Sequence, residues 1–93
     1  MIKTFQCKET KKIFNRSFSK KLPTDIQRTA LKKLVMLNNS TTLNDLKIPT
    51  NNNLELLQKD RKGQYSININ KQWRICFNWI NNNAYNVEIV DYH

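Results

Sequence analysis

The sequence predicts an α+β domain in which two N-terminal helices pack on one face of a mainly antiparallel, twisted sheet. Apolar residues recur at three- and four-residue intervals in the first 40 residues, as in amphipathic helices. In the last third of the chain apolar and polar residues alternate, as in strands with one buried face. A chain of 93 residues, 39% of them hydrophobic, is expected to form a single domain over residues 1–93.

Two short elements open the predicted fold. Residues 2–5 (IKTF) are a brief apolar stretch that is expected to form a strand. Residues 8–15 are mostly helix formers, and Ile13 and Phe14 supply the apolar side of the first helix.

The second helix has the clearer pattern. Thr24 and Gln27 have the spacing of a capping box, with Pro23 just ahead of them. An apolar stripe follows at helical spacing, made of Ile26, Ala30, Leu31, Leu34, Val35 and Leu37. The basic residues of this helix are expected on its outer surface, either as a solvated face or as an RNA contact: Arg28, Lys32 and Lys33.

Residues 38–63 are polar and rich in Asn, with Pro49 and Gly63 as helix and strand breakers. A loop of this length in a small domain is usually functional or disordered. Its aliphatic residues favour a loop pinned onto the core, with anchors at Leu43, Leu46, Ile48, Leu54, Leu56 and Leu57.

Three strands joined by short turns are predicted from residue 65 onward, as an antiparallel meander. Turns are expected at residues 70–71 and 81–83, because Asn tolerates positive φ. The apolar face that meets the helices is expected to contain Tyr65, Ile67, Ile69, Trp73, Ile75, Phe77, Trp79, Tyr85, Val87 and Ile89. The opposite face is expected to be polar and open, with Ser66, Asn68, Arg74, Cys76, Asn78, Asn86 and Glu88.

Arg74 is the only charged residue of the central predicted strand, and alternation puts it in the middle of the open face. An arginine there can bind phosphate through its planar fork. A simple cross-strand ion pair with Glu88 explains the residue equally well.

The positive charge is concentrated in the first half of the chain. Residues 1–40 carry ten positive and two negative side chains, whereas residues 41–93 carry six and five. This asymmetry favours a polyanionic partner, although many small proteins are basic without binding nucleic acid. No apolar run is long enough to cross a bilayer, and no signal-peptide pattern opens the chain, so we expect a cytoplasmic protein with no membrane partner.

Several chemistries find no support in the sequence. It has no phosphate-binding glycine loop, no dinucleotide glycine fingerprint, no zinc motif and only one His. Cys7 and Cys76 are too few and too far apart for a zinc site and are expected to be small buried residues. We therefore expect neither a cofactor nor a metal.

The remaining side chains suit cleavage of RNA by its own 2′-hydroxyl. That reaction needs a base, an acid and cations that stabilise the charge of the phosphorane. Tyr92 can stack on a base or exchange a proton, and His93 titrates near neutrality. The candidate phosphate-binding cations are Lys59, Arg61, Lys62 and Arg74. Each of these residues also has an ordinary surface role, so no single one is specific.

Three segments taken together resemble the HigB branch of the RelE/ParE toxin superfamily, and its GraT-like subgroup in particular. They are residues 60–67 (DRKGQYSI), residues 70–77 (NKQWRICF) and residues 91–93 (DYH), and residues 1–5 (MIKTF) resemble the start of the same proteins. The resemblance spans the chain and is strongest from Leu54 onward.

The resemblance implies a RelE-like fold and a toxin of a type II toxin–antitoxin module, a ribosome-dependent mRNA endoribonuclease. It implies a HigA-like antitoxin of the helix-turn-helix class, encoded by a neighbouring gene. The toxin would contact operator DNA only as part of its complex with this antitoxin. Arg74 matches the family's phosphate-binding arginine. The tail that helps to form the active site is matched by Asp91, Tyr92 and His93.

Two positions depart from the family pattern. Glu55 stands where better-studied HigB proteins have a histidine, and Gln58, beside Lys59, stands where they have a lysine. Glu55 would be a weak base at the ordinary carboxyl pKa of about 4.3, so an enzyme of low activity is expected. Two alternatives stay open: a ParE-type toxin that binds DNA gyrase, and a toxin that binds the ribosome without cutting RNA.

Overall fold

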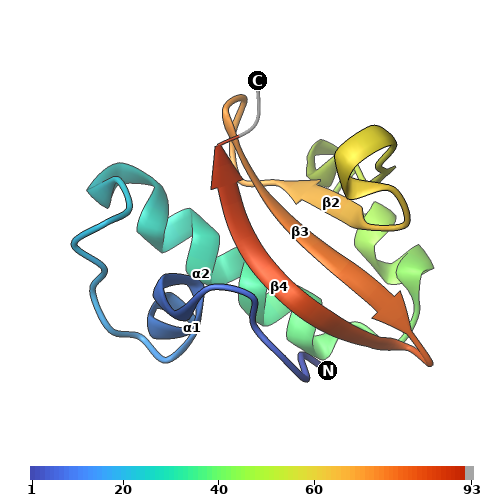
Figure 1. The fold of residues 1–93 in the computed structure, drawn as a ribbon, viewed down its shortest axis with the longest axis horizontal. Helices are drawn as coiled ribbons and strands as arrows, with labels where there is room; N and C mark the ends of the chain where they lie inside the picture. Colours follow the sequence, from blue (N-terminus) through green and yellow to red (C-terminus); the bar gives the residue numbers. More distant parts are fainter. Residues whose placement is uncertain (92–93) are drawn as a thin grey trace.

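The computed structural model describes residues 1–91, which form a layer of helices against an antiparallel sheet (Figure 1). The predicted fold class is confirmed. The helices and strands are α1 (Lys8–Phe14), α2 (Thr24–Asn39), β1 (Glu55–Leu56), β2 (Tyr65–Asn68), β3 (Trp73–Ile80) and β4 (Asn83–Asp91). Two short 3-10 helices join α2 to β1, η1 (Leu43–Lys47) and η2 (Thr50–Asn52), and a third, η3 (Lys59–Arg61), joins β1 to β2.

The sheet has the order β1-β2-β3-β4, and every pair of neighbouring strands is antiparallel. The N-terminal segment lies along the outer edge of β4 but makes only isolated parallel bridges, Ile2 to Ala84 and Phe5 to Val87. The strand expected at residues 2–5 is therefore reduced to single bridges. At the other edge, residues 43–61 gather beside β2 (Figure 1).

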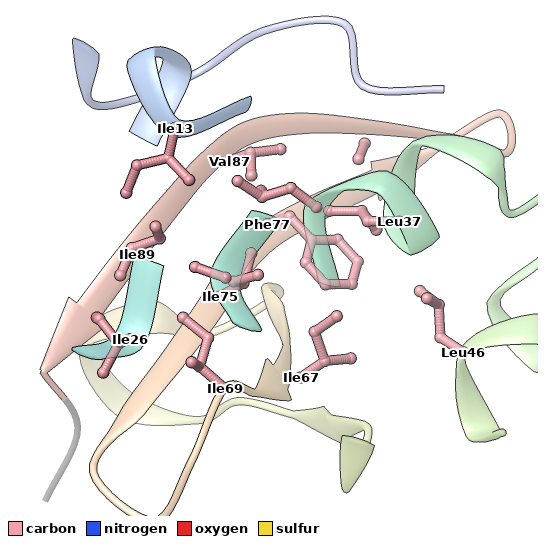
Figure 2. Close-up of a cluster of buried hydrophobic side chains, with 13 residues drawn as sticks. Ile13, Ile26, Leu37, Leu46, Ile67, Ile69, Ile75, Phe77, Val87 and Ile89 are labelled. Carbon is pink, nitrogen blue, oxygen red and sulfur yellow. The ribbon is translucent and has the colours of Figure 1, made fainter. Parts of the chain in front are cut away.

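The core lies between the helices and one face of the sheet (Figure 2). Phe77 and Ile75 of β3 are fully buried there, against side chains from α1, α2, β2 and β4. Burial of one such side chain stabilises the fold by about 1.5–3 kcal/mol. The alternation predicted for β3 is confirmed on this face, although Trp73 and Trp79 are only half-buried at its two ends.

A β-bulge changes the alternation in β4. Cys76 lies opposite Glu88, but Asn78 lies opposite Tyr85, so β4 has one extra residue between these pairs. Asn86 accommodates the extra residue by adopting a φ of 54°, a conformation that Asn tolerates better than most residues. The prediction that Tyr85 shares the apolar face with Val87 was wrong, because the bulge turns Tyr85 to the Asn78 side and puts Ala84 in the core.

The start of α2 is also built differently from the prediction. Thr24 makes no capping hydrogen bond, and Pro23 is the residue that precedes the helix. The Gln27 amide instead donates to the carbonyls of Ser19 and Leu22, and its oxygen accepts from the Ser19 amide. Gln27 therefore fastens the α1–α2 loop to the helix.

The long connection after α2 is pinned at two of the expected leucines. Leu46 is fully buried and Leu57 is 2% exposed, while Leu43 and Leu54 are half-buried against the core. The predicted anchors at Ile48 and Leu56 were wrong. These side chains are 75% and 50% exposed, because η1 and η2 coil the segment and β1 lies at the sheet edge.

Lys33 was expected on the outer surface of α2, and that prediction was wrong. Its side chain is only 8% exposed, because η2 packs against that part of the helix. The Lys33 ammonium donates to the side-chain oxygen of Asn52, a residue that is itself fully buried. Burial, with a smaller contribution from the charge of Lys32, lowers the pKa of Lys33. Arg28 and Lys32 are exposed, as predicted.

None of the helices in residues 1–91 combines the length and apolar composition needed to cross a bilayer.

Candidate functional site

The second face of the sheet carries the predicted site, and strand register fixes which residues meet there. Residues directly opposite each other in an antiparallel pair project to the same side. One row therefore runs across all the strands and consists of Glu55, Ser66, Cys76 and Glu88. The next row contains Asn68, Arg74 and Val90. Glu55 and Arg74 thus lie on the same face, one row apart.

Arg74 is the best-anchored residue of this face. Its Nε donates to the Ser66 hydroxyl at 2.8 Å, and its Nη2 donates to the Asn53 carbonyl at 2.9 Å. Asn53 adopts a left-handed conformation with φ 48° at the end of η2. The side-chain bond fixes the plane of the guanidinium, and the turn at Asn53 supplies the second acceptor.

Arg74 does not stand on an open face, so that part of the prediction was wrong. Only 6% of its surface is exposed, and Ser66 and Cys76 beside it are fully buried. The loop that follows η2 covers this region, as the bond from Arg74 to Asn53 shows. The alternative pairing with Glu88 is wrong too, because the Glu88 carboxylate pairs with Arg61 at 3.2 Å.

Arg61 joins the turn after β1 to the polar face. It donates to Gln64 at 3.1 Å as well as to Glu88, and Gln64 donates to Asn78 at 3.2 Å. A pocket of about 520 Å³ opens above this network, lined by Gln6, Asp60, Arg61, Lys62, Gln64, Asn78 and Glu88. Its volume is in the range of pockets that bind small ligands.

The lysines around Arg61 lie in a tight turn. Lys59 has a φ of 59° and Gly63 a φ of 90°, so the chain reverses sharply before β2. The side chains of Lys59 and Lys62 are exposed, and Lys62 lines the pocket next to Arg61. Two of the three predicted phosphate-binding residues of this turn therefore share one pocket.

The predicted proton-transfer residues are only partly placed by the structure. Glu55 is exposed and lies opposite Ser66, the residue that holds Arg74. Asp91 lies opposite Trp73, which puts it on the other side of the sheet from Arg74, and its carboxylate accepts from Gln72 at 3.2 Å. Tyr92 and His93 lie outside the described residues.

Sequence reasoning missed two residues that shape the site. Ser66 was placed on the correct face but not recognised as the partner of Arg74. Nothing in the sequence indicated the role of Asn53, because this residue binds Arg74 through its backbone carbonyl and not through its side chain. Burial raises the pKa of the Cys76 thiol, although Arg61 and Arg74 partly counteract the effect, so Cys76 is a neutral thiol beside the site.

Residues 1–91 bring no three His, Cys, Asp or Glu side chains together in a cluster suited to a metal ion.

Three curated proteins are similar to this chain in sequence, over different shares of their length. The chain is 37% identical over 67 residues to an uncharacterized protein of Haemophilus influenzae, a match that spans 72% of this chain and 66% of that protein. It is 37% identical over 65 residues to Toxin HigB-1 of Vibrio cholerae, spanning 70% of this chain and 68% of the toxin. It is 31% identical to Endoribonuclease HigB of Proteus vulgaris over 100% of both chains.

Solved structures with the same fold include a chain of the YoeB–YefM toxin–antitoxin complex from Staphylococcus aureus. The TM-score is 0.62, with 22% identity over 100% of this chain and 98% of that one. A second structure of the YoeB–YefM complex gives a TM-score of 0.60 with 18% identity. The family model that matches residues 3–93 is described as the RelE-like toxin of the type II toxin–antitoxin system HigB. The chain belongs to this HigB-like family of RelE-like toxins, as its sequence motifs predicted.

Proposed function

We propose that this chain is the toxin of a type II toxin–antitoxin module and that it inhibits translation by cutting mRNA on the ribosome. The observation that carries the proposal is the preorganised guanidinium of Arg74, held by Ser66 and Asn53. The same sheet face carries Glu55 and also Glu88, with which Arg61 of η3 pairs. The full-length likeness to Endoribonuclease HigB supports the same activity.

The reaction that fits these residues is transesterification. The RNA 2′-oxygen forms a bond to phosphorus, and the bond from phosphorus to the 5′-oxygen breaks. A base takes the proton of the 2′-hydroxyl, and an acid gives one to the leaving oxygen. The products are a 2′,3′-cyclic phosphate and a free 5′-hydroxyl, and the scheme needs no metal ion.

Arg74 would stabilise the charge that develops on the phosphorane. Ser66 and Asn53 fix the orientation of its guanidinium before RNA arrives, so little reorganisation is needed in the transition state. Its surroundings also exclude most water, which strengthens its interaction with an anion. Because only 6% of Arg74 is exposed, the proposal requires the phosphate to meet it through that small area.

The proton-transfer roles are assigned to Glu55, Tyr92 and His93, with Asp91 supporting the tail. Glu55 lies on the correct face for a base, next to the residue that anchors Arg74. Phosphates on either side of the cleavage point would contact the turn at η3 through Lys59, Arg61 and Lys62. A low rate is expected, since Glu55 is a carboxylate at a position where the family resemblance implies a histidine.

The proposed partners are the ribosome with its mRNA and an antitoxin of the helix-turn-helix class, with the toxin acting in the cytoplasm. Induction of the chain in bacteria, followed by mapping of mRNA 5′ ends, tests the activity. New 5′-hydroxyl ends inside coding regions are expected. Growth arrest with intact messages would contradict cleavage, and DNA breaks on induction would indicate a gyrase poison instead.

A further inference from the structure

A second pocket is lined by neither Arg74 nor Arg61, although its lining residue Asn68 lies opposite Arg74 in the sheet. It has a volume of about 440 Å³ and lies between α2, the residues around Pro49 and the turn that joins β2 to β3. Its polar lining includes Thr29, Lys32, Lys33, Asn51, Asn68 and Lys71. Nothing in the proposed cleavage reaction uses these residues.

The charge of this pocket is uncompensated within the described part of the chain. Its lining contains three lysines and neither Asp nor Glu. Lys33 is 8% exposed, and its ammonium donates to the neutral side-chain amide of Asn52. Within residues 1–91, Lys12 pairs with Glu9 and Arg61 pairs with Glu88, and neither pair compensates the charge of Lys33.

A buried ammonium costs free energy unless an anion or several acceptors surround it. An ammonium has three donors, and Asn52 accepts only one of them here. Lys32 and Lys71 add two exposed cations at the rim of the pocket. The arrangement is therefore complementary to an anion that enters from solvent.

We propose that this pocket binds a backbone phosphate of RNA, as a second contact separate from the cleavage centre. Lysines suit phosphate as compact point charges, and the Thr29 hydroxyl and the amides of Asn51 and Asn68 can donate to its other oxygens. The choice of RNA rests on the proposed function, whereas the affinity for phosphate follows from the pocket itself.

RNA binding by matched charge variants tests the proposal. The pocket variant Lys32→Gln/Lys71→Gln and the control Lys11→Gln/Lys20→Gln each remove two exposed positive charges, the control ones from outside the pocket. Fluorescence anisotropy with a labelled single-stranded RNA, at fixed salt, measures the RNA affinity of both variants. The pocket variant is expected to bind RNA about tenfold more weakly than the unmodified chain. The control variant is expected to lose less than about threefold in affinity. Equal losses would contradict the proposal.

A titration with inorganic phosphate, followed by NMR of the isotope-labelled protein, locates the anion. Amide signals of Thr29, Lys33 and Asn68 are expected to shift, and Lys33→Met is expected to abolish these shifts. If Lys33→Met does not fold, the two-lysine pocket variant gives the same test, because its lysines are exposed. Shifts confined to other surfaces would overturn the pocket as a phosphate site.

The two measurements separate this proposal from the proposed function. Phosphate shifts at the pocket, with RNA affinity unchanged in the pocket variant, would overturn RNA as the ligand. Intact mRNA on the ribosome, with RNA binding still dependent on the pocket, would contradict cleavage and leave this proposal supported.

Discussion

Within residues 1–91, Ser66 and Asn53 hold Arg74 in its orientation. Ser66 fixes the Nε edge of the guanidinium, and the Asn53 carbonyl fixes one of its terminal nitrogens. Because donors already in position stabilise a transition state without a reorganisation cost, the hydroxyl of Ser66 is expected to affect the chemical step more than substrate binding. Ser66 is therefore a positioning residue.

Ser66→Ala is expected to lower kcat about tenfold with little change in KM. The variant also leaves the buried Nε of Arg74 unsatisfied, which should lower the free energy of unfolding by about 1–3 kcal/mol. Cleavage kinetics on programmed ribosomes and urea denaturation measure the two effects. Ser17→Ala, an exposed serine near α1, is the control. A purely structural role would lower stability but leave the kcat of the folded protein unchanged.

The alternation of apolar and polar residues predicted the buried face of β3 correctly but failed in β4. Alternation placed Ile75, Phe77 and Arg74 on their observed faces, because β3 is regular. It failed for Tyr85, since a single bulge at Asn86 reverses the faces beyond it. It also failed to predict the burial of Arg74, which depends on η2 and the loop after it, a connection whose path no local pattern specifies.

The bulge at Asn86 can be tested by substitution. Asn86→Gly is expected to stay within about 0.5 kcal/mol of the original stability, because glycine adopts positive φ freely. Asn86→Val should lose about 1–2 kcal/mol, because a β-branched residue is strained there. Thermal or urea unfolding of both variants measures the difference. Equal stability of the two variants would contradict the assigned conformation.

The buried carboxylate of α1 gives the fold a pH dependence. The Ser19 hydroxyl donates to Glu9 at 2.7 Å, and Lys12 pairs with Glu9 at 3.3 Å. These contacts, the Ser19 bond first, hold the pKa of Glu9 below its ordinary value of 4.5. Since the pKa is lower in the folded chain, the stabilisation is present above pH 4.5 and is lost as the pH falls through the folded value.

Ser19→Ala is accordingly expected to destabilise the chain at neutral pH and to have a smaller effect once Glu9 is protonated. Urea denaturation of both proteins from neutral pH into the acid range measures this difference. A loss that stays the same at every pH would show that the Ser19 hydroxyl acts independently of the Glu9 charge.

At the scale of the molecule, charge and fold were predictable and the lining of the site was not. Residues 1–40 carry most of the positive charge, and α2 contributes two of the three lysines of the second pocket. The burial of Lys33 escaped prediction, because helical periodicity describes the main apolar stripe and not a loop that packs on its flank. The family motifs indicated Arg74 but not the partners that hold it.

The excess of positive charge predicts salt-sensitive binding to the ribosome. Affinity should fall at least tenfold between about 50 and 200 mM salt, as counterions compete for the RNA phosphates. Co-sedimentation of the chain with ribosomes over this range measures the effect. An affinity independent of salt would point to a docking surface that is not electrostatic.

The dependence of mRNA cleavage on Arg74 tests the central claim most directly. Purified ribosomes carrying a defined mRNA are mixed with excess toxin, either unmodified or Arg74→Ala, and single-turnover rates are compared after circular dichroism has shown both proteins to be folded. The unmodified chain is expected to cut in the A site and leave 2′,3′-cyclic phosphate ends, and Arg74→Ala to cut about 10²–10³-fold more slowly. Cleavage by Arg74→Ala at the unmodified rate would contradict the assignment of Arg74.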